Sequence, residues 1–165
     1  MYTQDDTQFL TSQIYTMKEF LNEDQEKSVI RAIREAETSS SGEIRVHLED
    51  KCEKDDPIER AIEVFAELNM HETQLRNGTI IYVATEDHKI AIWGDEGIHS
   101  KVGQDFWDDE LELLTKYFMA DDYETGLREA VLKIGEKLRE YFPYQGEDDI
   151  NELPDDISYG GNKDA

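Results

Sequence analysis

Five carboxylates lie close together in one stretch of the sequence, IAIWGDEGIHSKVGQDFWDDELELL, residues 90–114. They are Asp95, Glu96, Asp105, Asp108 and Asp109, and between the first and the last of them the only lysine or arginine is Lys101. Hard cations such as Ca²⁺ bind six to eight oxygen ligands from carboxylates, carbonyls and water. Glycines flank the first two acids, so the backbone there can bend to bring carbonyl oxygens inward. The stretch therefore predicts a Ca²⁺ or Mg²⁺ site.

A second interpretation of the same residues stays open. Asp105, Asp108 and Asp109 stand where a helix is expected to begin, and acidic side chains are common there because they cap the helix and complement its dipole. The spacing also differs from that of an EF-hand loop. The pattern is thus compatible with cation ligands and with ordinary residues of a helix start.

The periodicity of apolar residues predicts the elements that position these side chains. Alternating residues in SSSGEIRVHLED indicate a half-buried strand, and TIIYVAT and IAIW indicate two more strands joined by the tight turn EDHK. Helical spacing predicts five helices: residues 9–21, a helix after the N-cap Asn22, residues 57–70 with Pro57 in the first turn, one starting near Asp105, and one from Tyr123 to Phe142 that Pro143 ends.

This order of elements predicts a fold. A strand–helix–strand unit forms a parallel pair with a right-handed crossover, and the hairpin makes the third strand antiparallel to the second. With five helices to place, both faces of the sheet should be covered. The sequence therefore predicts an α/β protein, a three-layer α/β/α sandwich with a mixed sheet and one β-hairpin.

The hairpin also predicts where the acidic stretch lies. The first two strands begin at Gly42–Glu43 and Asn77–Gly78, and the third strand ends at Gly94–Asp95 on the same sheet edge. A loop of about ten residues then leads back to the helix near Asp105. All five carboxylates are therefore expected at one edge, with Arg76 beside them, either binding an anion or forming a surface salt bridge.

Composition limits the classes of partner. The 165 residues include 17 basic and 40 acidic side chains, a net charge of −23, which argues against nucleic acid and anionic membranes and favours cations or a protein partner with a basic surface. With one cysteine no intrachain disulfide is possible, and the N-terminus has no signal-peptide pattern. We expect a cytoplasmic protein with no membrane segment, because the apolar run IIYVA is far too short to span a bilayer.

The domain organisation follows from the same pass along the chain. Residues 1–9 are expected to be frayed, residues 10–143 to form one domain, and residues 144–165 to form an acidic, mostly disordered tail with an anchoring segment at Ile150–Leu153.

Other catalytic or metal motifs are missing from the sequence. It contains no P-loop, no GxGxxG and no HExxH motif. The histidines, which have no metal-binding spacing, are expected at the surface: His47, His71, His88 and His99. Cys52 precedes Arg60 by eight residues, too far for the thiolate–phosphate loop of cysteine phosphatases, and is expected to be inert. Trp93 and Trp107 are expected to be packing residues.

Several segments together resemble the TPM domain family, which includes thylakoid acid-phosphatase-like and photosystem II repair proteins. They are SSSGEIRVHLED, AIEVFAELNMHETQLRNGTIIYVATEDHKIAIWGDEGI, VGQDFWD and YETGLREAVLKIGEKL, and the chain looks most like the soluble, stand-alone bacterial branch. Many members carry GYGLEG and then LTD after this strand. Gly94 and Asp105 match that pattern, whereas Asp95 and Glu96 replace its tyrosine and glycine.

The resemblance implies a Rossmann-like sandwich and divalent-cation binding, notably of Ca²⁺, in loops beside the sheet. Plant-type members are described as acid phosphatases. Our first hypothesis is a regulatory or interaction module that binds Ca²⁺ or Mg²⁺ weakly through Asp95, Glu96 and Asp105, with Asp108 or Asp109 assisting. The alternatives are a metal-assisted acid phosphatase in which Arg76 helps to neutralise the phosphate, with catalytic residues unknown, and a structural adaptor that does not depend on metal.

Overall fold

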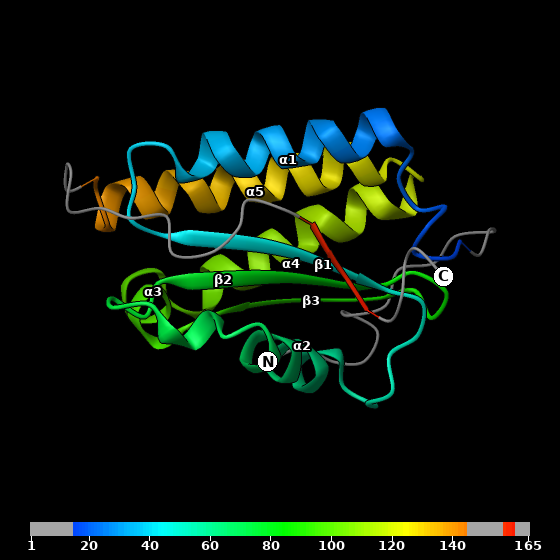
Figure 1. Cartoon of the computed structure of the whole chain (residues 1–165), viewed down its shortest axis with the longest axis horizontal. Coiled ribbons are helices and arrows are strands. Elements are labelled where there is room, and N and C mark those ends of the chain that lie inside the picture. Colours follow the sequence, from blue (N-terminus) through cyan, green and yellow to red (C-terminus); the bar gives the residue numbers. More distant parts are fainter. Residues whose placement is uncertain (1–14, 145–156, 161–165) are drawn as a thin grey trace.

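The computed structural model describes residues 15–144 and 157–160 (Figure 1). Within these residues the chain forms five α-helices, one 3₁₀ helix and four strands. In chain order they are α1 (Glu23–Glu37), β1 (Glu43–Glu49), α2 (Pro57–Glu67), η2 (Met70–Glu72), β2 (Gly78–Ala84), β3 (Lys89–Gly94), α3 (Glu96–Val102), α4 (Gln104–Met119), α5 (Tyr123–Tyr141) and β4 (Ile157–Tyr159).

The strands form one mixed sheet in the order β3-β2-β1-β4. β1 and β2 are parallel, with Glu43 opposite Gly78, and β2 pairs with β3 in the predicted antiparallel hairpin. His88 occupies the turn of this hairpin with a positive φ of 54°, a conformation that histidine tolerates better than most residues. The predicted parallel pair and hairpin are confirmed.

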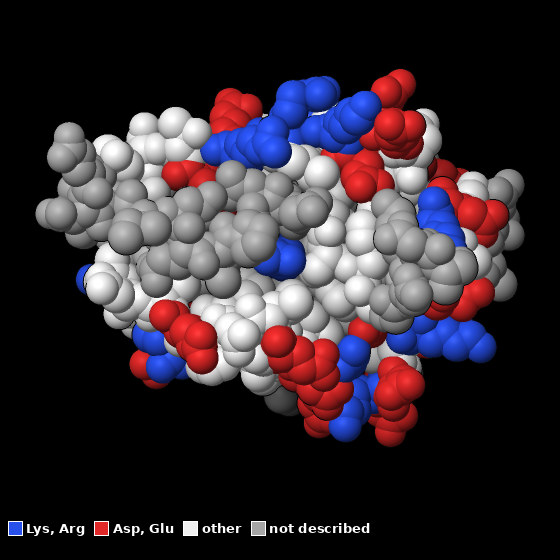
Figure 2. Space-filling view, viewed as in Figure 1, with Lys and Arg blue, Asp and Glu red and all other residues white. Residues whose placement is uncertain are grey.

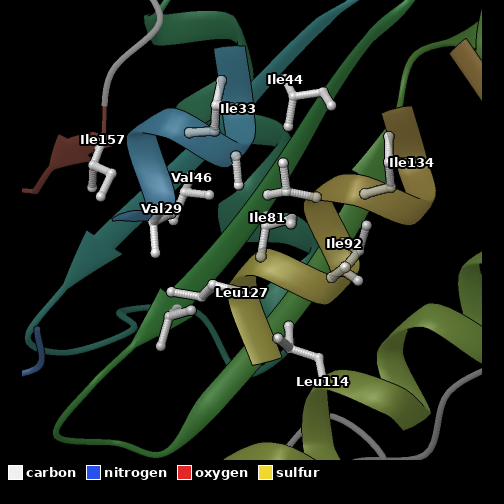
Figure 3. Packing of buried hydrophobic residues seen from close by; sticks show 14 of the residues in the cluster. Val29, Ile33, Ile44, Val46, Ile81, Ile92, Leu114, Leu127, Ile134 and Ile157 are labelled. Atoms are coloured by element: carbon white, nitrogen blue, oxygen red, sulfur yellow. The ribbon is translucent and has the colours of Figure 1, made fainter. Parts of the chain in front are cut away.

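Helices cover both faces of the sheet (Figure 1). α1, α4 and α5 lie on one face, where they enclose the larger apolar core with Val46 and Ile81 of the sheet (Figure 3). α2 covers the other face and buries Phe65 against Ile80 and Tyr82. β1 and β2 are consequently buried along their whole lengths. The predicted α/β/α sandwich is confirmed.

Local signals begin the helices where the sequence predicts. The Asn22 side chain accepts a hydrogen bond from the backbone N–H of Gln25, and the Gln25 side chain accepts one from Asn22, which forms a reciprocal capping box. Pro57 occupies the first turn of α2 behind the N-cap Asp56. Because these caps satisfy otherwise unpaired backbone N–H groups, they fix both helix starts independently of the core.

The predicted helix over residues 9–21 is wrong in the part that the structure describes. Residues 15–21 form turns, in which the Glu19 carboxylate accepts hydrogen bonds from the backbone N–H and the hydroxyl of Thr16. Met17, Phe20 and Leu21 are nevertheless buried, and Phe20 stacks on Tyr123 with ring centroids 4.2 Å apart. The apolar spacing therefore reflects packing of a turn against the core.

Two further elements differ from the expectation. The loop predicted after Asp95 contains the short helix α3, which Asp95 caps and whose Ile98 is fully buried. The C-terminal range expected to be mostly disordered contains β4, which pairs with β1. The proposed anchor Ile150–Leu153 lies outside the described residues. Among the residues that are described, no helix is long and apolar enough to cross a membrane.

Candidate functional site

A cleft of about 640 Å³ runs along the free edge of β3, which we call the β3-edge cleft. Its walls come from β3, α3 and the starts of α2 and α4, and its lining includes Arg76, Trp93, Asp95, Glu96, His99 and Trp107. Two of the five predicted carboxylates, Asp95 and Glu96, thus line a cleft, and the geometry of their side chains determines which ligands fit there.

Asp95 is the most buried acid of this cleft, with 1% of its surface exposed. Its carboxylate accepts two hydrogen bonds from Arg76, Nε to Oδ2 at 2.7 Å and Nη2 to Oδ1 at 3.0 Å. The backbone N–H of Glu96 donates a third, at 2.8 Å, as part of the α3 cap. Both oxygens of Asp95 are therefore occupied, and a guanidinium already neutralises the charge.

The other four predicted ligands do not converge on Asp95. The Glu96 side chain is largely exposed and lies 3.6 Å from Nη1 of Arg76. Asp105, Asp108 and Asp109 follow one another along α4, where Asp108 accepts a hydrogen bond from Gln104 at 3.0 Å. No group of three or more His, Cys, Asp or Glu side chains in the described part of the chain is placed to hold a metal ion. The predicted ligand set stays a prediction.

Aromatic side chains form the firm wall of the β3-edge cleft. The indole Nε1 of Trp107 donates a hydrogen bond to Nδ1 of His99 at 3.1 Å, and Trp93 packs edge-on against Phe65 with centroids 4.7 Å apart. A Cβ atom on Gly94 would lie 2.7 Å from Cη2 of Trp107, so this position requires glycine for close packing. The packing role predicted for both tryptophans is confirmed.

A second polar cluster lies at the other end of the sheet, where the parallel strands β1 and β2 end. It consists of His47, Glu49, Arg60 and Tyr82, and we call it the Glu49 cluster. The Glu49 carboxylate accepts hydrogen bonds from Arg60 Nε at 3.0 Å, from the Tyr82 hydroxyl at 2.7 Å and from His47 Nε2 at 3.3 Å, and Arg60 Nη2 also contacts it. These partners lie 2 to 33 residues from Glu49 along the chain.

The electrostatics of the Glu49 cluster follow from these contacts. Burial by itself would raise the pKa of Glu49, but the hydrogen bonds from His47, Arg60 and Tyr82 outweigh it and lower the pKa to about 2. The same hydrogen bonding to Glu49 raises the pKa of Arg60 above its usual range. Burial, reinforced by the neighbouring carboxylate, raises the pKa of Tyr82. Glu49 is therefore an ionised, fixed carboxylate at any ordinary pH.

One sequence expectation changes at this cluster. His47 is buried, with 4% of its surface exposed, so its predicted surface position is wrong. Both faces of β1 are buried, and His47 lies on the face that carries Glu49. Arg60 donates to Glu49, and the expectation that Cys52 and Arg60 form no thiolate–phosphate loop is unchanged. The buried Cys52 thiol donates instead to the carbonyl of Lys54 at 3.2 Å.

An open cleft of about 400 Å³ adjoins the Glu49 cluster, and we call it the carboxyl-edge cleft. It is lined by Glu49, Asp50, Lys51, Glu53, Arg60, Glu86 and Gly160. Sequence reasoning missed it, although a signal was present: ligands of open α/β sheets bind beyond the carboxyl ends of the strands, and acidic segments follow both β1 and β2. On the face that Figure 2 presents, Lys and Arg form small groups among Asp and Glu.

The fold and these two clefts define an α/β/α sandwich protein with a polar site at each end of a short mixed sheet. The TPM domain family matches residues 14–137, most of the chain, and the chain belongs to this family. No curated protein matches it.

Solved structures agree with this assignment. The chain is similar to the BA42 protein of the psychrophilic bacterium Bizionia argentinensis, with 45% identity and a TM-score of 0.79, covering 88% of this chain and 99% of that one. It also has the fold of the N-terminal domain of the cg2496 protein from Corynebacterium glutamicum, with 13% identity and a TM-score of 0.58, covering 81% and 88% of the two chains.

Proposed function

We propose that this TPM domain binds Ca²⁺ or Mg²⁺ weakly and acts as a regulatory or interaction module, with a partner that presents a basic surface. The acidity of the chain supports a cationic ligand and a basic partner, because a net charge of −23 attracts both. The five carboxylates predicted from the sequence are one candidate site, and the carboxyl-edge cleft is another.

The carboxyl-edge cleft is the better candidate because three of the four acids that line it, Asp50, Glu53 and Glu86, are less fully paired than Asp95. Four acidic residues line it, and Arg60, one of its two cations, is neutralised by Glu49. Asp50 uses one oxygen to accept the backbone N–H of Met17 at 2.7 Å, and within the described part of the chain its other oxygen has no hydrogen-bond donor. Glu53 is exposed and Glu86 half-buried at the rim. In the β3-edge cleft, by contrast, the guanidinium of Arg76 already takes the place that a cation would occupy between Asp95 and Glu96.

The same observation explains why binding should be weak. Ca²⁺ requires six to eight oxygen ligands, whereas no three acidic side chains of the described residues are placed to hold one ion, so one or two side chains of this cleft would contribute at a time. Water would supply the rest, and the flexible side chains of Glu53 and Glu86 would have to become ordered. We therefore expect a dissociation constant of about 0.1–1 mM, in the range of weak protein sites.

A Ca²⁺ titration monitored by backbone NMR shifts tests the proposal. At constant ionic strength, the Ca²⁺-induced shifts should concentrate at residues 49–53 and 85–87. The dissociation constant obtained from them should rise about tenfold in Glu86→Gln. Glu35→Gln, which removes the same charge from an exposed position on α1, is the matched control and should keep the wild-type response. Shifts at residues 94–109 would instead favour the sequence-predicted site. A response that NaCl reproduces in full would mean counterion screening and would refute both sites.

A further inference from the structure

The C-terminal segment 157–160 pairs with the outer edge of β1. In this parallel pairing Ile157 lies opposite Val46, Ser158 opposite His47 and Tyr159 opposite Leu48. The strand, red in Figure 1, is only three residues long and belongs to a region more than 100 residues away from β1 in the sequence. Each residue of the segment makes a contact that depends on its type.

Ile157 and Tyr159 face the larger apolar core. Ile157 is 4% exposed and belongs to the same cluster as Val29 and Val46, as the close-up shows (Figure 3). Tyr159 packs against the rim of this cluster and is half-buried. The first position of the segment therefore requires a large apolar side chain, and the third favours an aromatic one.

Ser158 points to the opposite face and contacts the Glu49 cluster. Its hydroxyl lies 2.7 Å from Nδ1 of His47, whose Nε2 lies 3.3 Å from the Glu49 carboxylate. A carboxylate only accepts, so Nε2 carries the proton that it donates to Glu49, and in the neutral ring Nδ1 accepts from the Ser158 hydroxyl. A small hydroxyl side chain is thereby selected at the second position.

Gly160 completes the recognition. Its N–H donates to the carbonyl of Leu48 at 2.7 Å, which extends the pairing by one residue. A Cβ atom at this position would lie 2.6 Å from Cδ of Glu49. Glu49 cannot move aside easily, because Arg60, Tyr82 and His47 all hold its carboxylate. The fixed acid therefore excludes every residue except glycine from the fourth position.

We propose that the edge of β1 is a strand-docking site for an extended peptide of the form apolar–Ser–aromatic–Gly. In this chain β4 occupies the site from within the same molecule, and a peptide with the same sequence on another polypeptide can replace it. Addition of a strand to a sheet edge supplies backbone hydrogen bonds for affinity and side-chain pockets for specificity. A three-residue strand at a sheet edge opens at low free energy, which makes the exchange feasible.

The test uses the full-length chain and a labelled synthetic peptide of residues 154–163, PDDISYGGNK. The Gly160→Val substitution should displace the internal strand, because its side chain would overlap Glu49, and it leaves the residues of β1 unaltered. This variant should bind the peptide at least about tenfold more tightly than the wild type, because a tethered competitor acts at millimolar effective concentration. Backbone shifts should appear at Val46, His47 and Leu48.

Control peptides separate specific docking from simple adhesion. A peptide with Gly160→Val should not bind, and one with Ser158→Ala should bind several-fold more weakly. If Gly160→Val prevents folding of the chain, the Ser158→Ala chain, which keeps the fold-compatible glycine, serves as the acceptor. No peptide-induced shifts on β1 at about 2 mM peptide in a folded acceptor, or equal binding of the valine peptide, would overturn the proposal.

Discussion

Arg76 and Asp95 form a bidentate ion pair that joins the start of β2 to the start of α3, with N–O distances of 2.7 and 3.0 Å. The pair is asymmetric: the Asp95 carboxylate is 1% exposed, whereas 43% of the Arg76 side chain remains accessible. Arg76 adopts a positive φ of 52°, and its carbonyl accepts the N–H of Gly97 at 2.8 Å. Both the side chain and the backbone carbonyl of Arg76 thus attach the loop that precedes β2 to the start of α3.

Replacing Arg76 with glutamine should destabilise the fold, because it leaves the buried Asp95 charge without its cation. We expect a lower midpoint in urea unfolding, and the change should be small because solvent reaches the guanidinium. Glu96→Gln removes only an exposed contact and should change stability by less than about 0.5 kcal/mol.

The Arg76→Gln variant also tests where a cation binds. Its Ca²⁺ response should equal that of the wild type if the carboxyl-edge cleft is the site. A stronger response would instead point to Asp95.

Glu49 should govern stability in acid. Its pKa is about 2 in the fold against 4.5 for an ordinary glutamate, so the stability that its ionised form contributes is complete above pH 4.5 and is lost as the pH falls towards 2. The change from 4.5 to about 2 corresponds to about 3.4 kcal/mol, which partial access of solvent to the cluster reduces to about 2–3 kcal/mol. Glu49→Gln should lower the free energy of unfolding at pH 7. It should also make that free energy less dependent on pH between pH 4.5 and 2. The exposed Glu53→Gln is the control; an equal loss of pH dependence there would show that the effect is general charge loss.

Glu110 should have the opposite effect. Burial raises its pKa to about 7, against the opposing attraction of Lys133, and one of its buried carboxylate oxygens has no hydrogen-bond partner among the described residues. The folded state holds the proton more tightly than the unfolded state, so stability declines as the pH rises from 4.5 to 7 and stays reduced above it. Glu110→Gln should therefore stabilise the chain by about 1–3 kcal/mol at pH 8 and hardly at pH 5. Thermal unfolding at both values measures this, and equal changes at the two pH values would contradict it.

Gly135 should be required for the close contact of α5 with α1. A Cβ atom there would lie 2.6 Å from Cβ and 2.7 Å from Cα of Ala36, so the two helices cannot keep their separation around a larger residue. Gly135→Val should cost about 1–3 kcal/mol through overpacking. The adjacent exposed substitution Glu136→Val introduces the same side chain on the same helix and should change stability much less. Similar losses in both variants would attribute the effect to helix propensity.

The sequence alone was sufficient to predict the elements whose signals are local. The alternation in β1, the turn between β2 and β3, the Asn22 cap and Pro57 each act within a few residues, and each predicted structure is present. From these local elements the handedness of the crossover and the need to cover both faces lead directly to the three-layer sandwich. The sequence also placed Arg76 beside Asp95, because hairpin geometry brings the start of β2 next to the end of β3.

Only the tertiary structure decided how distant residues pair. No local pattern relates Glu49 to Tyr82, 33 residues on, or His47 to Ser158, 111 residues on, since a polar residue in a strand has the same local signature whether it faces water or a buried partner. The spacing of Met17 and Phe20 indicated a helix for a similar reason: a turn packed on the core buries the same residues that an amphipathic helix would bury. β4 is too short to have a recognisable period. It is a strand because it pairs with the edge of β1 that β2 leaves free, where Ile157 joins the larger apolar core and glycine fits beside Glu49.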